Sequence, residues 1–291
     1  MPARVPTLAE AQAYCKQLTE SHYENFHVAS WFLPKRLRVH FHSVYAYCRI
    51  ADDLGDEVGN PEQSLALLNW WEQQLDLCYK GEASHPVFVA LAETVRICEI
   101  PKQPFADLLV AFRQDQTITR FETQEQMAEY ARYSANPVGR LVLYMCGYSD
   151  EERFALSDFT CTGLQVANFL QDVSVDYKKG RIYLPEQDRE RHEVPEAVIA
   201  AGVATPEFRE LMRYEVGYAY RLFGKGEPLI QMVDHELALD LNLFTLGGLE
   251  ILRAIEAQGY DVLRARPSIP KSRKLKLLMS ALMSKFLGRR P

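Results

Sequence analysis

Long stretches of the chain place apolar residues at every third or fourth position, and short polar signals separate these stretches. ALLNWWEQQLDLCY and FRELMRYEVGYAYRLF are two of them, and their spacing is typical of amphipathic helices. No apolar–polar alternation is long enough to predict a strand of a sheet, and no Asn-Gly or Asp-Gly pair marks a tight hairpin. We therefore predict an all-α protein that folds as a single domain over residues 1–291.

Helix starts are marked by side chains that can satisfy the free backbone N–H groups of a first turn. The predicted starts are Thr7 with Glu10, Asn60-Pro61 with Gln63, Thr123 with Gln126, and Thr205-Pro206. The helix that begins after Asn60 should end near Gly81. Pro137 lies within a helical pattern and should kink that helix. The stretch from Gly180 to Ala204 is the most irregular one, which predicts a long loop.

One predicted helix, FHSVYAYCRIADDLGDE, carries a narrow polar stripe. At about 100° per residue, Tyr45, Arg49, Asp52 and Asp56 fall within about 60° of one another. The other faces are mostly apolar, so we expect this helix to lie inside a bundle. Two carboxylates one turn apart repel each other unless a cation lies between them.

A second predicted helix, in TGLQVANFLQDVSVDYKKGRIYLP, repeats this arrangement. Gln165, Asn168, Asp172 and Asp176 share one narrow stripe, and apolar residues fill the other faces. A single Asp-x-x-x-Asp pair is typical of a solvated helix face. Two such stripes on otherwise apolar helices favour a shared interior site for a cation instead.

Oxygen ligands of this kind suit Mg²⁺, which keeps several waters and shares a phosphate group. Such a site would grip a diphosphate and neutralise the charge that develops as it leaves, and Arg49 and Arg181 are candidates to hold the same group. The carbocation left behind needs apolar walls and π faces. The aromatic candidates for these walls are Phe26, Tyr45, Tyr130 and Tyr183, although the pattern favours a core position for each of them.

Composition and charge exclude several other classes of protein. With 47% hydrophobic and 25% charged residues, the chain has a globular composition. Its net charge of −6 argues against nucleic acid as the main partner. No apolar run is long enough to span a membrane. The first residues do not resemble a secretory signal, and six cysteines without a CxxC pair predict a reducing, cytoplasmic location.

Four segments resemble the squalene/phytoene synthase family of isoprenoid synthases. Asp52-x-x-x-Asp56 resembles its first aspartate motif, and QxxNxxxDxxxD from Gln165, followed by GRIYLP, resembles the second. YARYSANPVG and HYENFHVASWFLPKRLR resemble two further family segments. The resemblance covers nearly the whole chain and implies a helical bundle around a central cavity, in which both motifs bind Mg²⁺ and a prenyl diphosphate.

Within the family, NFHVAS, SANPVGRLVL and NFLQDVSVD resemble the bacterial hydroxysqualene synthases of hopanoid pathways. That subgroup ionises presqualene diphosphate and quenches the rearranged cation with water to give hydroxysqualene. Members that condense two farnesyl diphosphates commonly carry serines near Tyr23 and Asn25 and an Arg or Glu at Gln171. These departures favour the hydroxysqualene reaction. The resemblance to this subgroup implies other enzymes of the squalene/hopanoid pathway as possible partners.

The resemblance also assigns roles, residue by residue. Asp52, Asp56, Asp172 and Asp176, with Asn168, are implied metal or diphosphate ligands. The resemblance implies that eight further residues support the ligands or bind the substrate: Tyr45, Arg49, Gln165, Arg181, Tyr183, Phe26, Tyr130 and Asn136. The water that quenches the cation has three candidates to position it, namely Asn136, Asn168 and Gln165.

Two other functions stay open at this stage. One is the head-to-head condensation of two farnesyl diphosphates to presqualene diphosphate or squalene, or of geranylgeranyl diphosphates to phytoene. The other is a non-catalytic assembly or binding protein on the same fold, although this chain keeps all four motif carboxylates.

The C-terminal end differs in charge from the rest of the chain. Residues 262–291 contain nine basic and no acidic residues, and KSRKLKLLMSALMSKFLG has apolar positions at helical spacing. This predicted helix either packs on the bundle or contacts the anionic inner membrane surface peripherally. A third alternative is that Arg266 and Lys271 face the cavity mouth, as basic residues do in relatives.

Overall fold

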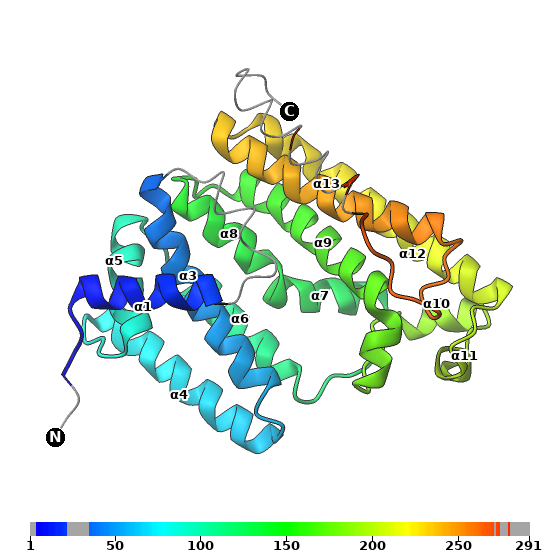
Figure 1. Ribbon diagram of the computed structural model, residues 1–291, viewed down its shortest axis with the longest axis horizontal. Helices are drawn as coiled ribbons and strands as arrows, with labels where there is room; N and C mark the ends of the chain where they lie inside the picture. Colours follow the sequence, from blue (N-terminus) through cyan, green and yellow to red (C-terminus); the bar gives the residue numbers. More distant parts are fainter. Residues whose placement is uncertain (1–3, 22–34, 271, 274–278, 280–291) are drawn as a thin grey trace. The chain divides into compact units, whose positions relative to one another are not determined.

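The computed structural model describes residues 4–21, 35–270, 272–273 and 279, and every regular element in these ranges is helical (Figure 1). The helices are α1 Leu8–Ser21, α3 Lys35–Asp56, α4 Pro61–Lys80, α5 Pro86–Ile97, α6 Gln103–Gln114, α7 Gln124–Ser134, α8 Asn136–Met145, α9 Glu151–Lys178, α10 Glu186–Arg191, α11 Glu196–Ala201, α12 Pro206–Gly226, the 3₁₀ helix η1 Glu227–Gln231 and α13 His235–Ala257. The predicted all-α class is confirmed.

Two compact units make up the chain. Unit 1 comprises Met1–Thr117 and Pro137–Phe154, and unit 2 comprises Ile118–Asn136 and Ala155–Pro291. The single domain expected from the sequence stays a prediction. Among the described helices, none combines the length and apolar character that crossing a membrane requires.

The predicted helix starts are confirmed. The Asn60 side chain accepts hydrogen bonds from the first turn of α4, and Thr123 and Thr205 do the same for α7 and α12. Thr7 and Glu10 bond each other's backbone N–H groups ahead of α1. Each such cap contributes about 1 kcal/mol, so the polar signals in the sequence fix where helices begin.

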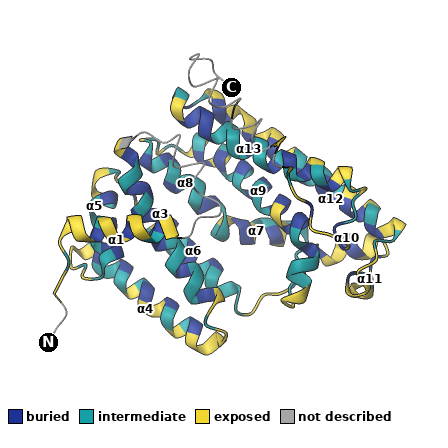
Figure 2. Cartoon of the chain, viewed as in Figure 1, coloured by how far each residue is buried: buried dark blue, intermediate teal, exposed yellow. Residues whose placement is uncertain are grey.

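Four large aromatic side chains form the centre of unit 1. Tyr47 of α3 stacks on Trp71 of α4 at 5.9 Å between ring centroids and meets the rings of Phe88 and Phe105 edge to face. Its hydroxyl donates to the Phe105 carbonyl over 2.9 Å. All four side chains are fully buried, and Figure 2 shows the buried stripe of α4 opposite its exposed one. This packing fixes the rotation of α3 about its own axis.

The helices α9, α12 and α13 of unit 2 approach one another closely at a glycine. A Cβ atom added at Gly248 would lie 2.4 Å from the ring of Phe223 and 2.9 Å from Leu164. Real Cβ atoms do not approach other atoms so closely, so any larger residue at this position would force the Phe223 and Leu164 side chains to shift. The buried residues of α12 include Phe208, Leu211 and Phe223, and Phe223 packs near Gly163 and Leu164 in the middle of α9.

Two predictions about irregular structure need correction. The stretch from Gly180 to Ala204 is not one long loop, because it contains α10 and α11 and an isolated bridge between Arg120 and Ile182. The pattern around Pro137 is interrupted rather than kinked: α7 ends at Ser134, and a new helix begins with Pro137 in its first turn. Proline is tolerated in a first turn because its missing N–H would have no helical partner.

Candidate active site

The polar stripe of α3 is only partly covered by the unit 1 core, against which Tyr45 packs. Tyr47 and Ala51 are fully buried, whereas Tyr45 and Asp52 are partly exposed and Asp56 is exposed at the helix end. The helical spacing seen in the sequence therefore brings these polar groups to one face, as predicted.

Arg49 neutralises part of the acidic cluster on α3. Its Nη1 lies 3.2 Å from a carboxylate oxygen of Asp52, and its Nη2 pairs with Asp53 and, at 3.1 Å, with Glu57. Burial and the charge of Asp56 nevertheless raise the pKa of Asp52 to about 6. The C-terminal end of α3 thus carries more negative charge than Arg49 balances, and a cation at this face would be stabilised.

The second stripe lies on the C-terminal half of α9. The Asp172 side chain is 14% exposed, Gln165 and Asp176 are partly buried, and Asn168 is exposed. Burial and the charge of Asp172 raise the pKa of Asp176 to about 6, although Lys179, Arg181 and Arg266 lower it. In both acidic pairs, burial and the charge of the neighbouring aspartate therefore raise the pKa of one carboxyl group, that of Asp52 on α3 and that of Asp176 on α9.

A distant arginine supplies the counter-charge at Asp172. The guanidinium of Arg266 contacts both carboxylate oxygens of Asp172, with Nη2 at 3.0 Å from Oδ2. The same Nη2 donates to Oε1 of the buried Gln171 over 3.0 Å. The Gln171 amide in turn donates to the Pro267 carbonyl over 2.6 Å. Gln171 is thus one anchor of the segment that carries Arg266.

The end of α9 is shaped by Gly180, which adopts a left-handed φ of 80°. The Arg181 N–H donates to the Asp176 carbonyl and the Gly180 N–H to the Tyr177 carbonyl, both over 2.9 Å. These two bonds form a Schellman motif, the common helix end with glycine at the left-handed position. The motif places Arg181 immediately beside the last motif aspartate.

The loop after α9 carries Tyr183 against an aromatic surface. The Tyr183 ring stacks on Phe169 of α9 with 3.7 Å between centroids and 5° between planes. Tyr130 and Phe121 lie next to it, with centroids 6.3 and 5.6 Å away. Tyr130 is buried, so its ring is a core residue. Tyr183 is partly exposed and can present a π face to a ligand.

Of the remaining residues predicted for the site, Asn136 is buried and Phe26 lies outside the described residues. The side-chain oxygen of Asn136 is buried and accepts a hydrogen bond from Thr162 over 3.0 Å. This bond ties the residue to α9. Phe26, together with Tyr23 and Asn25, lies outside the described residues. So does most of the basic tail, Lys271 included.

Each acidic pair could hold a divalent cation through oxygen atoms. Within the described ranges, no three His, Cys, Asp or Glu side chains cluster as a metal cage. Carboxylates in pairs fit Mg²⁺, which binds through one or two carboxylates plus waters and phosphate oxygens. The donor set and its excess negative charge therefore fit this ion, with the remaining ligands coming from solvent and a bound phosphate.

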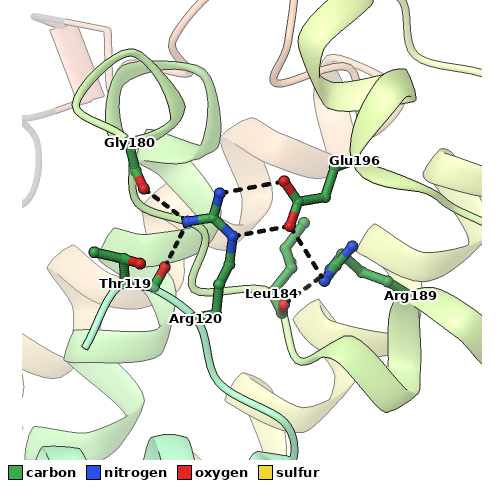
Figure 3. Close-up of polar contacts among 6 residues, drawn as sticks. All are labelled: Thr119, Arg120, Gly180, Leu184, Arg189 and Glu196. Carbon is green, nitrogen blue, oxygen red and sulfur yellow. Dashed lines mark hydrogen bonds and ion pairs between the residues drawn. The ribbon is translucent and has the colours of Figure 1, made fainter. Parts of the chain in front are cut away.

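Two contacts at this site have no local signature in the sequence. Arg120 reaches Gly180 and Glu196 (Figure 3), and Arg266 reaches Asp172, 94 residues away in the chain. Long-range ion pairs follow from how distant segments fold back, which no helical spacing encodes. For Arg266, its basic stretch and the resemblance to relatives indicated a residue that faces the cavity mouth, but neither identified Asp172 as its partner.

Comparison with known proteins identifies the family to which the chain belongs. Residues 19–273 match the family described as squalene/phytoene synthase, so the chain belongs to that family. A squalene synthase, HpnC, from Alicyclobacillus acidocaldarius has a similar structure, with a TM-score of 0.84 and 46% identity over 87% of this chain and 95% of that one. The expectation of family membership from the aspartate motifs is confirmed.

Two other relatives cover nearly the whole chain. A ligand-bound dehydrosqualene synthase has a TM-score of 0.86 and 26% identity over 97% of this chain and 98% of that one. A 15-cis-phytoene synthase from Synechococcus elongatus is 28% identical over 97% of both chains. The family is one of enzymes that act on prenyl diphosphates, and this chain has both of its acidic motifs.

Proposed function

We propose that the protein is an Mg²⁺-dependent enzyme that ionises a prenyl diphosphate. The observation that carries this proposal is the pair of carboxylates on each of α3 and α9, where burial and mutual repulsion raise the pKa of Asp52 and of Asp176 to about 6. Such excess negative charge has a purpose at a metal site and costs stability elsewhere. When bound, Mg²⁺ would neutralise the diphosphate as a leaving group.

The protein's own groups would hold and orient the substrate. Arg49 and Arg266 each lie against a motif aspartate, and a guanidinium can exchange that carboxylate for a phosphate oxygen of similar geometry. Arg181 follows the last motif aspartate and can hold the same group. Tyr183 is partly exposed and belongs to a stack with Phe169 and Phe121, which would supply π-rich surface to the allylic cation. Ionisation then needs no nucleophile from the protein.

We propose hydroxysqualene synthesis from presqualene diphosphate as the particular reaction. It is supported by the motif variants in NFHVAS, SANPVGRLVL and NFLQDVSVD and by Gln171 in place of a charged residue. Asn168 and Gln165, on the same face of α9, are the candidates to position the quenching water. The buried Asn136 is the weaker candidate, because its side-chain oxygen already accepts a hydrogen bond from Thr162.

Condensation of two prenyl diphosphates is the second candidate. The names of the relatives favour it, since they are a squalene synthase, a dehydrosqualene synthase and phytoene synthases. An assay of the pure protein with Mg²⁺ and one substrate at a time separates the two reactions. Hydroxysqualene from presqualene diphosphate alone would support our proposal. A thirty-carbon product from farnesyl diphosphate alone, or phytoene from geranylgeranyl diphosphate, would establish condensation instead.

A non-catalytic role on this fold has its own test. In that case neither substrate yields product, while Mg²⁺ with inorganic pyrophosphate still binds in calorimetry.

We also propose that the basic segment 262–291 attaches the protein to an anionic membrane surface from the cytoplasmic side. Co-sedimentation with anionic but not with neutral vesicles would support this, and equal recovery with both would contradict it.

A further inference from the structure

The loop that follows the second acidic motif is held at both ends by arginine side chains (Figure 3). Arg120 donates from Nη1 to the Gly180 carbonyl over 2.6 Å and to the Thr119 carbonyl over 2.9 Å. Arg189 donates from Nε to the Leu184 carbonyl over 3.3 Å. The Gly180 and Leu184 carbonyls lie on either side of residues 181–183, so the two arginines hold the loop before and after this segment.

One carboxylate joins the two arginines. Glu196, the first residue of α11, accepts from Arg120 Nε at 2.9 Å and from Arg120 Nη2 at 3.2 Å. Its Oε1 also lies 4.0 Å from Nη2 of Arg189, whose side chain is only 6% exposed. A bidentate pair of this kind fixes the plane of a guanidinium as well as its position. The Arg120 guanidinium is therefore oriented on one edge by Glu196 and is directed at Gly180 by the other.

The backbone of the loop pairs with the segment that carries Arg120. The Ile182 N–H donates to the Thr119 carbonyl over 2.9 Å, and the N–H groups of Glu186 and Gln187 donate to Phe121 and Glu122 over 2.9 and 3.0 Å. The side chains of Ile182 and Leu184 are buried at 3% exposure each. Since side chains alternate along extended backbone, Arg181 and Tyr183 are left to the other side.

We propose that Arg120, fixed by Glu196, is the residue that positions Arg181 and Tyr183 for the diphosphate reaction. The inference rests on the proposed function, and it assigns a role to a side chain outside both motifs. Arg120 holds the carbonyl of the glycine that ends α9, so it determines the direction in which the chain leaves Asp176. Lysine could keep the charge at this position, but its single ammonium cannot bond Glu196 and the Gly180 carbonyl in the same fixed plane.

The first test compares Arg120→Lys, Arg120→Met and Glu196→Gln with the wild type in steady-state kinetics. We expect kcat/KM to fall about tenfold or more for both Arg120 variants, because misplacement of a positioning group by about 1 Å costs this much or more. Glu196→Gln should lie between them and the wild type, since its amide accepts one bond but presents N–H groups to a guanidinium. Arg132→Met, which removes an exposed ion pair with Glu129 on α7, is the matched control.

The second test does not depend on turnover. Hydrogen exchange in Arg120→Met should accelerate at the amide of Ile182 and leave the amides of α12 unchanged, and binding of Mg²⁺ with inorganic pyrophosphate should weaken. Faster exchange throughout unit 2 would mean a general loss of stability and would overturn the positioning role. So would wild-type kinetics and exchange in both Arg120 variants.

The two proposals fail in different ways. If the wild type turns over no prenyl diphosphate, the proposed function fails, whatever the exchange at residues 180–185 shows. If the wild type is active and Arg120→Lys is equally active with an unchanged KM, the positioning role fails and the proposed function stands.

Discussion

The two acidic motifs reach the same electrostatic state by different routes. On α3, Asp52, Asp53 and Glu57 share Arg49, and all four residues lie within nine consecutive positions of the chain. On α9, Asp172 is paired with Arg266 from the far end of the chain. Because the first arrangement is local, it follows from helical spacing alone. The second depends on the loop after α9 and on the segment anchored by Gln171.

This difference determines what would remove the counter-charge from each motif. The counter-charge on α3 survives as long as the helix does, because the partners are one or two turns apart. The counter-charge on α9 is lost when a distant segment moves, even with the helix intact. Ligand binding can therefore release Arg266 from Asp172 without unwinding any helix, whereas Arg49 remains within reach of the carboxylates on its own helix even when it contacts a phosphate.

The largest effect expected is on turnover when one carboxylate of either motif is neutralised. Asp52→Asn and Asp172→Asn should each lower kcat by about 10²–10³-fold, because a lost metal ligand costs several kcal/mol of transition-state stabilisation. The measurement is the rate of product formation from presqualene diphosphate and from farnesyl diphosphate. Residual activity within about threefold of the wild type would contradict the role of that motif.

Controls and a double variant sharpen this result. Asp107→Asn on α6 and Glu129→Gln on α7 remove carboxylates outside the motifs and should leave kcat unchanged. The sequence predicts that both motifs serve one diphosphate, and this stays a prediction. If it is right, the double variant Asp52→Asn/Asp172→Asn should lose little more than the worse single variant, since residues that act as a unit are not additive.

The contrast between the motifs also explains what the sequence could predict. The helices and their starts at Asn60, Thr123 and Thr205 follow from local capping chemistry, as do the faces of α3 and α9. The pairing of Arg266 with Asp172 and of Arg120 with Gly180 joins segments 94 and 60 residues apart. Such contacts depend on the path of the chain, which periodicity does not contain. The helices α10 and α11 have a different cause: at six residues each, they are too short to show a helical period among the charges of that stretch.

A smaller effect is expected when each arginine is replaced by lysine. At residue 49, lysine can still reach carboxylates on its own helix, so Arg49→Lys should change KM by no more than about threefold. At residue 266, lysine loses the bidentate geometry on Asp172 and the bond to Gln171, and KM should rise about tenfold. The measurement is KM for the prenyl diphosphate at saturating Mg²⁺. Equal effects at both positions would remove the distinction between local and long-range counter-charge.

Thermal stability should respond to pH in the same direction at both motifs. The folded-state pKa values of Asp52 and Asp176 are about 6, above the ordinary value of 3.8. Their contribution to stability is therefore fully present below about pH 4 and is lost as the pH rises through about 6. Asp52→Asn and Asp176→Asn should raise Tm at pH 7 without Mg²⁺ by a few degrees, and should leave it unchanged near pH 4. Lower Tm values at pH 7 would show that these charges are already balanced in the protein.

The smallest effect expected separates the helix ends beside the two motifs. At Gly180 the backbone has a φ of 80° and no atom lies within 4 Å of an added Cβ, so Gly180→Ala should cost about 1 kcal/mol through backbone conformation alone. At Gly55 an added Cβ would make an ordinary contact of 3.5 Å with Phe112, and Gly55→Ala within α3 should raise stability by about 0.5–1 kcal/mol. Denaturant unfolding measures both. Asparagine tolerates the left-handed region better than alanine does, so Gly180→Asn should recover part of the loss. If Gly180→Asn recovers none of the lost stability, the left-handed φ is not the reason that glycine is needed at this position. A steric reason is excluded already, because the space around an added Cβ is open.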